Sequence, residues 1–347
     1  MRITIIAAAV TLAASSLSSQ AMARDSIWIA GSSTVFPFST AVAETFGRES
    51  SFPTPKVESL GTGGGFKLFC SGVGVDKSDI SNASRPMKLS EYEQCQANGV
   101  KDITEVKIGY DGIAIAHSKA GPTLDLSLGE IWLALAKDVP NEAGELVPNP
   151  YRKWSEINKD LPDTPIEVLG PPPTSGTRDA FVELAMEGGC NSFDAVKALK
   201  DADKDRHKAV CQGIREDGAF VEAGENDNLI VQKLVANPDA LGIFGFSFLD
   251  QNTDKIQGTK IDGIEPTFDS IADGSYPISR SLYFYVKNAH VGTIPGIPEY
   301  IAEFTADKAW GPDGYLADKG LIPLPEAMRV SVAADAKALK PMSQPSK

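Results

Sequence analysis

The sequence predicts an α/β protein of two lobes, in which helices cover β-sheets. Short β-branched or apolar runs alternate with helical patterns along most of the chain, a pattern typical of this class. A strand, a small polar turn and a helix start follow one another twice near the N-terminus. The length of 347 residues allows one or two domains, each able to bury its own core, and we expect two.

The first 23 residues have the pattern of a secretory signal peptide. Arg2 precedes an apolar run at residues 3–14, a Ser-rich stretch and Ala21-Met22-Ala23, an A-x-A cleavage signal. A transmembrane anchor is the alternative, but the run is shorter than the roughly 20 residues that span a bilayer. Cleavage after Ala23 removes 23 of 347 residues, so we expect a soluble mature chain of 324 residues in the periplasm.

The chain is acidic. Its formal net charge of −13 becomes −14 when Arg2 leaves with the signal peptide, and a charge of this sign repels nucleic acid and anionic membranes. We therefore expect no nucleic-acid partner, and any site for an anion must be local.

Two strand–turn–helix units open the mature chain. The first has a strand at residues 27–30, a turn at 31–34 and a helix from Pro37, because a first helical turn tolerates proline. The second has a strand at residues 56–60, a glycine-rich turn at 61–65 and a helix at 66–70.

Later elements suggest where the chain crosses between the lobes. An apolar strand region at residues 106–116 is broken at Asp111-Gly112, and further strands are expected at 241–249 and 281–286. Ser90 with Glu93, and Ser127 with Glu130, are capping boxes that start helices at residues 91 and 128. The predicted units are lobe 1 at 24–112 plus 283–337, lobe 2 at 113–282, and a polar, disordered tail at 338–347.

The four cysteines fall into two pairs that are close in sequence. Export favours disulfides, and we expect the local connectivity, Cys70–Cys95 and Cys190–Cys211, among the three that four cysteines allow. A zinc site is the alternative, but there is no C-x-x-C spacing and no histidine near Cys70 or Cys95. We expect neither a metal nor another cofactor.

Three loops of small polar residues are each placed to open a helix. The first amides of a helix lack intrahelical partners and face the positive end of the helix dipole, so they bind small oxyanions without a net-basic protein. Ser and Thr hydroxyls add donors. Each loop alone is equally well explained as an ordinary N-cap, but three of them favour a shared anion site. The loops are Gly31-Ser32-Ser33-Thr34-Val35, Gly61-Thr62-Gly63-Gly64-Gly65 and Thr174-Ser175-Gly176-Thr177-Arg178.

Arginine forms forked hydrogen bonds to oxyanions, and two arginines lie in small polar sequence of this kind. Arg178 ends the third loop and Arg85 stands in Ser84-Arg85-Pro86. Arg280 precedes a strand with no such loop beside it, and we interpret it as part of an ordinary ion pair.

Motifs of other functional classes are incomplete. The glycine run does not give G-x-G-x-x-G, because residue 66 is Phe, and no P-loop lysine is followed by Ser or Thr. The hydrolase signature G-x-S-x-G does not occur, and the three histidines lie far apart, in surface or loop positions as we read them. Asp201, Asp203 and Asp205 resemble the start of a calcium loop, but Arg206 stands where glycine is needed.

Several ordered segments together resemble the PstS phosphate-binding proteins. The resemblance implies a type II-like periplasmic-binding-protein fold with a ligand cleft between the lobes. It also implies a monomer without enzymatic activity, which binds inorganic phosphate and delivers it to the permease of an ABC importer. The segments are Ala30 to Pro37, Gly61 to Phe66, Asp79 to Pro86, Ser175 to Arg178, Asp227-Asn228, Leu241 to Ile243 and Tyr276 to Arg280.

The resemblance also implies which residues bind the ligand, and here the sequence departs from the family twice. Many members carry an aspartate where Arg85 stands, and an arginine where Pro171 stands. The aspartate accepts a protonated phosphate oxygen, so its absence leaves another oxyanion (sulfate, molybdate, a phosphonate or a phosphate ester) as the alternative ligand; a secreted phosphatase-like hydrolase is a more distant one. The expected ligand residues are Ser33, Thr34, Val35, Thr62, Ser84, Arg85, Ser175, Gly176, Thr177 and Arg178.

Overall fold

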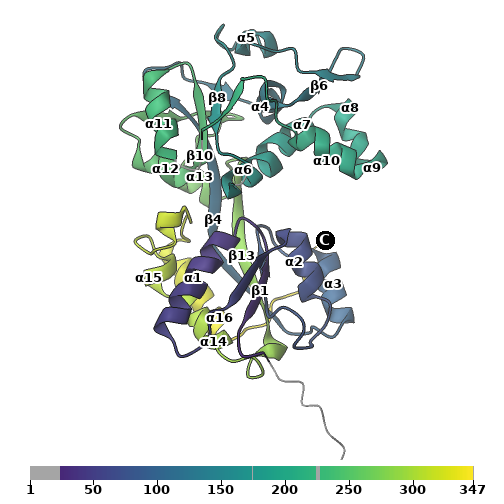
Figure 1. Ribbon diagram of the computed structural model, residues 1–347, viewed down its shortest axis with the longest axis vertical. Coiled ribbons are helices and arrows are strands. Elements are labelled where there is room, and N and C mark those ends of the chain that lie inside the picture. Colours follow the sequence, from purple (N-terminus) through teal and green to yellow (C-terminus); the bar gives the residue numbers. More distant parts are fainter. Residues whose placement is uncertain (1–23, 174, 224–226, 347) are drawn as a thin grey trace, which may run out of the picture.

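The computed structural model describes residues 24–173, 175–223 and 227–346, and the expected signal peptide lies outside them. These residues form two lobes joined by the long strands β4 (Ile103–Ser118) and β13 (Ser279–Lys287) (Figure 1). The α/β class and the two-lobe architecture are confirmed. Among the described residues, no helix combines the length and the apolar character needed to cross a membrane.

One sheet path runs through both lobes in the order β2-β1-β3-β13-β4-β10-β8-β9, and β11 also pairs with β4. Strand β1 is parallel to β2 and β3, whereas β13 runs antiparallel to β3 and β4. The strands are β1 (Trp28–Gly31), β2 (Lys56–Ser59), β3 (Ile80–Ala83), β5 (Asp125–Leu126), β6 (Asp138–Pro140), β7 (Leu146–Pro148), β8 (Val168–Gly170), β9 (Phe220–Glu222), β10 (Leu241–Gly245), β11 (Ile256–Gly258) and β12 (Lys260–Ile261).

Helices cover both faces of the sheets, as Figure 1 shows. In the first lobe they are α1 (Phe36–Glu49), α2 (Gly61–Phe69), α3 (Leu89–Ala97), η2 (Asn288–His290), α14 (Ile297–Phe304), α15 (Asp307–Trp310), η3 (Ala317–Lys319) and α16 (Glu326–Lys337). In the second they are α4 (Leu128–Leu135), α5 (Trp154–Ile157), α6 (Gly176–Phe181), η1 (Val182–Met186), α7 (Glu187–Cys190), α8 (Asp194–Lys197), α9 (Leu199–Ala202), α10 (Lys204–Gln212), α11 (Asp227–Ala236), α12 (Phe246–Gln251) and α13 (Phe268–Ala272).

Strand β4 changes partners where the sequence suggested a break. Its residues up to Gly112 pair with β13, and those from Ile113 on pair with β10. The strand itself stays continuous, so Asp111-Gly112 marks the passage between the lobes rather than an interruption. Separate apolar clusters fill the two lobes: Ile108 and Leu282 belong to one, and Ile115 and Ile243 to the other.

Four local expectations were wrong. Residues 61–65 belong to helix α2 and do not form a separate loop before it. The glycine at residue 65 is needed inside the helix, because α2 passes close to Gly31 there. Ser90 does not cap α3; Lys88 does, and its N–H donates to Glu91. Residues 246–249 begin α12 instead of extending β10. The histidines His117, His207 and His290 are buried, not on the surface. The capping box of Ser127 and Glu130 at the start of α4 is confirmed.

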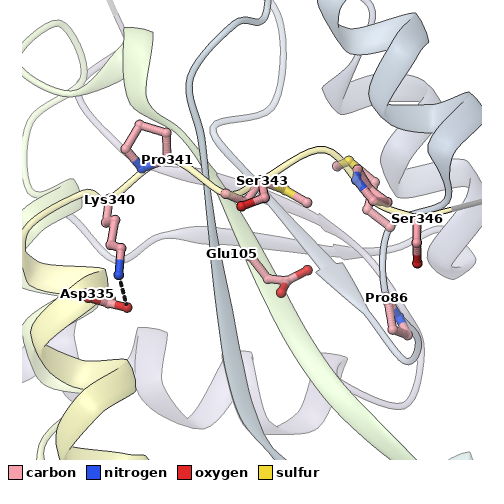
Figure 2. A pocket seen from close by; sticks show the side chains of 10 residues that line it. Pro86, Glu105, Asp335, Lys340, Pro341, Ser343 and Ser346 are labelled. Carbon is pink, nitrogen blue, oxygen red and sulfur yellow. Dashed lines mark hydrogen bonds and ion pairs between the residues drawn. The ribbon is translucent and has the colours of Figure 1, made fainter.

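The C-terminal tail, which we expected to be disordered, packs on the first lobe. The N–H of Met342 donates to the carbonyl of Ile103 at 2.8 Å, and the side chain of Asn288 donates to the carbonyl of Leu339 at 2.9 Å. Figure 2 shows this segment passing Glu105 and Pro86, with which it lines a pocket of about 490 Å³. Backbone hydrogen bonds to the edge of a strand order a polar segment that has no core of its own.

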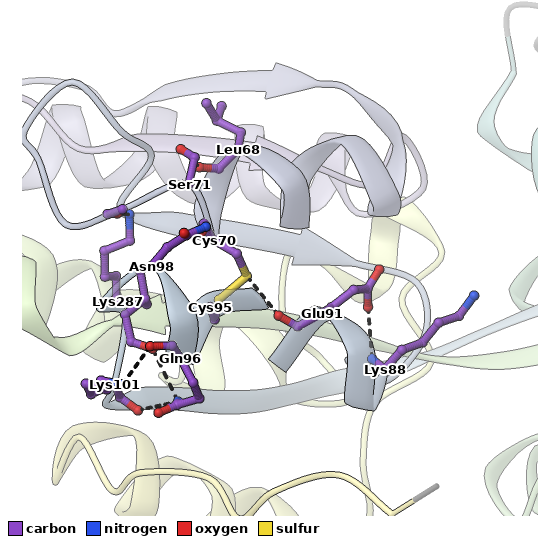
Figure 3. The surroundings of a disulfide bond; sticks show 12 residues. Leu68, Cys70, Ser71, Lys88, Glu91, Cys95, Gln96, Asn98, Lys101 and Lys287 are labelled. Atoms are coloured by element: carbon purple, nitrogen blue, oxygen red, sulfur yellow. Dashed lines mark hydrogen bonds between the residues drawn. A yellow bond between two sulfur atoms is a disulfide. The ribbon is translucent and has the colours of Figure 1, made fainter. Parts of the chain in front are cut away.

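Both expected disulfides are confirmed. Cys70–Cys95 joins the end of α2 to α3, and Figure 3 shows the bond with Asn98, whose side chain donates to the carbonyl of Cys70. Cys190–Cys211 joins α7 to α10. Each bridge thus holds a helix that borders the space between the lobes.

Candidate anion-binding cleft

The first loop connects β1 to α1. Ser32 is buried and stabilises the turn, because its N–H donates to Asn82 and its carbonyl accepts from the N–H of Phe36. Val35 is fully buried and its N–H points at the Ser32 hydroxyl at 3.4 Å. Ser33 faces the cleft between the lobes. Of the residues expected in this loop, Ser33 is therefore accessible to a ligand, and Val35 is not.

The second loop is the start of α2, which approaches β1 closely. A Cβ atom on Gly65 would lie 2.5 Å from the Cα atom of Gly31, so only glycine fits at this contact. The hydroxyl oxygen of Thr62 accepts the N–H of Ser84 at 3.1 Å and lies 3.0 Å from the Ser84 hydroxyl. Two segments that are 22 residues apart in sequence are thereby joined at one wall of the cleft.

Arg85 also lines this cleft, but its guanidinium already has an acidic partner. It forms a forked pair with Glu91 of α3, at 2.9 and 2.7 Å, and lies over the ring of Phe66. Glu91 offsets the charge that Arg85 was expected to supply. A ligand would have to share this arginine with the carboxylate.

The third loop lies in the second lobe, before α6. The hydroxyl of Ser175 accepts the N–H of Thr177 at 3.2 Å, so Ser175 acts as an N-cap. Gly176 and Thr177 line a second cavity, of about 310 Å³, which also touches Thr34. Arg178 lines neither cavity: its guanidinium donates to the carbonyl of Pro171 at 3.1 Å and lies 4.4 Å from the centre of the Phe220 ring. Burial lowers the pKa of Arg178.

Arg280, which the sequence analysis interpreted as part of an ordinary ion pair, lines the cleft. Its Nη2 donates to the hydroxyl of Thr34 at 2.5 Å, its Nη1 to Glu183 of η1 at 2.7 Å, and its Nε to Asp111 of β4 at 3.3 Å. One side chain, 9% exposed, thus connects the first loop, the second lobe and the strand between them. It is an ion pair, as expected, but one that lines the cleft. Its partners lie 97 to 246 residues away in sequence, so no local pattern reveals it.

Two carboxyl groups near Arg280 have raised pKa values. Burial raises the pKa of Asp111, and Arg280 opposes this shift. Burial and the charge of Glu183 raise the pKa of Asp179 of α6, whose carboxyl shares a hydrogen bond with Ser33 of the other lobe. Ser33 and Thr34 are therefore both in contact with the second lobe, through Asp179 and through Arg280.

The cleft between the lobes has a volume of about 780 Å³ and is lined by four of the six candidates from lobe 1. Ser33, Thr62, Ser84 and Arg85 line it together, whereas Thr34, Gly176 and Thr177 line the neighbouring cavity, and Val35, Ser175 and Arg178 line neither. The rest of the cleft wall consists of Ser32, Leu60, Gly61, Gly63, Gly64, Glu183, Leu184, Glu187, Lys200, Lys204, His207, Lys208, Gln212 and Arg280.

The residues that the sequence offered for a calcium or other metal site have other roles in the structure. The side chain of Asp203 accepts the N–H of Arg206, so it caps α10. His207 lies near Cys190 and Cys211, but both sulfurs belong to a disulfide and are not thiolate ligands. His290 is paired with Asp79, and His117 with Thr259 and Gln257. Each of these side chains therefore has a hydrogen-bond partner within the protein, so a metal ion is not needed to explain its position.

Comparisons with known proteins show the family of this chain. A PBP superfamily domain matches residues 17–308. A phosphate-binding protein PstS from Staphylococcus saprophyticus is 30% identical over 301 residues, which cover 85% of this chain and 79% of that protein. The chain belongs to the PstS family of phosphate-binding proteins. Protein SphX from Synechococcus elongatus is 30% identical over 263 residues, 74% of this chain and 66% of that protein.

Solved structures support the same fold. A possible phosphate-binding protein from Planctomyces limnophilus superposes with a TM-score of 0.69 at 28% identity, over 90% of this chain and 98% of that one. An ABC-type phosphate transport receptor from Vibrio cholerae has a TM-score of 0.55 at 20% identity, over 86% of this chain and all of that one, and supports the fold alone. The fold is the type II fold of periplasmic binding proteins. The PstS relative is named as a phosphate-binding protein, not as an enzyme.

Proposed function

We propose that this PstS-family protein binds inorganic phosphate with high affinity between its lobes and delivers it to the permease of an ABC importer. The observation that carries the proposal is the common position of Ser33, Thr62 and Ser84 in one cleft, at the starts of α1 and α2 and after β3. Hydroxyls and first-turn amides are donors suited to a small tetrahedral oxyanion.

Arg280 supplies the buried positive charge in this proposal. Arg85 is held by Glu91 and Arg178 by Pro171, whereas Arg280 already donates to Thr34 of the first loop. The Arg280 guanidinium is also bound by the exposed carboxylate of Glu183. A phosphate oxygen that approaches Ser33 and Thr34 would compete with this carboxylate for the guanidinium.

Closure of the lobes would then trap the ligand. We take residues 24–112 with 283–337 as lobe 1 and 113–282 as lobe 2, with β4 and β13 as the connections between them. Closure would bring Gly176 and Thr177 of α6 toward Thr34, which already borders their cavity. The closed form would dock on the permease as a monomer in the periplasm, after removal of residues 1–23.

Another oxyanion is the second candidate ligand. It is favoured by the presence of Arg85 at a position where the family resemblance leads us to expect an aspartate. An arginine in place of the expected aspartate removes an acceptor for the phosphate proton, which is the group that would exclude fully ionised sulfate. An unmatched buried donor or acceptor costs about 1–3 kcal/mol, enough to change the preferred anion by roughly tenfold or more.

Calorimetric titration of the purified protein with phosphate, sulfate and molybdate at two pH values tests the proposal. We expect heat of binding with phosphate, and weaker or no heat with the other two. Binding of sulfate or molybdate without phosphate would replace the assigned ligand, and binding of none of them would reject the anion-receptor function. Phosphate uptake by cells that lack the protein then tests delivery to a permease.

A further inference from the structure

Three lysines form one wall of the cleft opposite the anion loops. Lys200 of α9 and Lys204 and Lys208 of α10 follow one another at intervals of four residues, all are exposed, and all line the cleft. Lys204 and Lys208 lie on one face of α10, because side chains four residues apart in a helix are neighbours, and Lys200 precedes them on the separate helix α9. The opposite wall is the start of α2 with Thr62, so the lysines and the hydroxyl donors face the same space.

These lysines are the cleft cations that form no ion pair within the described part of the chain, although the charge of Lys208 acts on Asp179. Arg85 is paired with Glu91, and Arg280 with Asp111 and Glu183. None of the three lysines forms an ion pair with another described residue. The side chains that line the cleft carry five positive and two negative charges. With Glu91 and Asp111, which pair with Arg85 and Arg280, the balance is still one positive charge in a protein of net charge −13, and the lysines supply the positive charges that are not paired.

A disulfide fixes the helix that carries Lys204 and Lys208, and the acidic residues of the same segment do not line the cleft. Cys190–Cys211 fastens α10 to α7, and His207 between the lysines is buried and contacts Asn191 at 3.1 Å. Asp201 and Asp205 lie on the same helices but do not line the cleft. The segment therefore separates its charges, with the basic side turned to the cleft.

We propose that Lys200, Lys204 and Lys208 form an anion-capturing surface that attracts phosphate to the cleft and speeds its association with the loop site. The inference rests on the proposed function, since it concerns how that ligand arrives. A cleft lined by one sign of charge concentrates the opposite ion and raises association rates by about 10- to 1,000-fold. An acidic protein needs such a local field more than a neutral one, because its overall charge repels phosphate.

The test compares two triple variants with the wild-type protein. Lys200→Gln/Lys204→Gln/Lys208→Gln removes the lysine wall, and Lys137→Gln/Lys159→Gln/Lys233→Gln removes three exposed lysines of the same lobe that lie outside the cleft. Both sets change the net charge equally. Association of radiolabelled phosphate is measured by rapid filtration at ionic strengths of about 0.01 M and 1 M, where the Debye length is about 30 and 3 Å.

We expect association with the wall variant to be about tenfold slower at low salt and close to wild type at high salt. The control variant should differ little from wild type at either salt concentration. An association rate of the wall variant that equals that of the control at low salt overturns the proposal while leaving phosphate binding intact. Failure of the wild-type protein to bind phosphate at all would reject the proposed function, and the capture surface with it.

Discussion

The guanidinium of Arg280 donates a 2.5 Å hydrogen bond to the hydroxyl of Thr34, which places a nearly buried cation directly against the first anion loop. The same guanidinium also donates to Glu183 of lobe 2, to which Arg280 belongs, and to Asp111 at the end of lobe 1 on β4. One side chain therefore connects the first loop of lobe 1 with lobe 2.

Replacement of Arg280 should weaken phosphate binding strongly. Arg280→Gln removes the cation and should reduce the affinity at least tenfold in calorimetry, since hydrogen bonds to charged groups contribute about 1.5–3 kcal/mol. Arg152→Gln is the control, because Arg152 pairs with Asp217 on the surface of the second lobe. Thr34→Val provides a second test if loss of the partner of Asp111 unfolds the first variant. Unchanged affinity in a folded variant would remove Arg280 from the site.

The hydroxyl of Thr62 should contribute through its position beside Ser84. Thr62→Ala removes a cleft donor and leaves the Ser84 N–H without its acceptor, so the affinity for phosphate should fall about tenfold. Thr62→Ser keeps the hydroxyl and should bind nearly as well as the wild type. Equal titration curves for the alanine and serine variants would show that the hydroxyl does not take part.

Glu183 should hold the unliganded lobes together indirectly, by fixing the Arg280 guanidinium that donates to Thr34 of lobe 1. Glu183→Gln removes the charge that attracts Arg280, so small-angle X-ray scattering of the phosphate-free protein should give a larger radius of gyration than wild type. Glu187→Gln is the matched control, because Glu187 also lines the cleft but its carboxylate bonds to Gln212 of its own lobe. The same scattering profile for both variants would contradict this role.

Lys287 should make the free energy of unfolding depend on pH in the alkaline range. Burial lowers the pKa of this lysine from 10.5 to about 8, although Asp79 opposes the shift. Between about pH 8 and 10.5 the unfolded chain therefore binds one more proton than the folded chain, so the free energy of unfolding should rise with pH in that window.

The Lys287→Met variant should lack this increase. Guanidinium unfolding of both proteins from about pH 7 to 10 should show the wild type gaining stability relative to the variant as the pH rises. Lys101→Met, at an exposed lysine of the same lobe, should follow the wild type (Figure 3). A pH-independent difference between the wild type and Lys287→Met would contradict the shifted pKa.

The sequence predicted those parts of the site whose signals are local. The loops before α1 and α6 were found from small polar residues at helix starts, and both disulfides from spacing and compartment. The start of α2 was placed too late because glycines normally indicate a turn, whereas the close approach to Gly31 requires Gly65 within the helix.

The missed features depend on contacts between distant parts of the chain. Arg280 meets Thr34 across 246 residues, and the tail meets Ile103 through a backbone bond at Met342, so neither leaves a periodic pattern. The pairing of Arg85 with Glu91 was missed for another reason: the two residues are close in sequence, but their contact depends on how α3 packs beside the loop. Neighbouring residues in the sequence indicate where helices start, but tertiary packing determines which charged side chains remain unpaired and available to a ligand.

A crystal structure with bound phosphate tests the central claim most directly. We expect tetrahedral density within hydrogen-bonding distance of the hydroxyls of Ser33, Thr62 and Ser84, with the Arg280 guanidinium turned toward it. Density for the anion at another place on the protein, or a cleft that holds only water when calorimetry shows binding, would contradict the account.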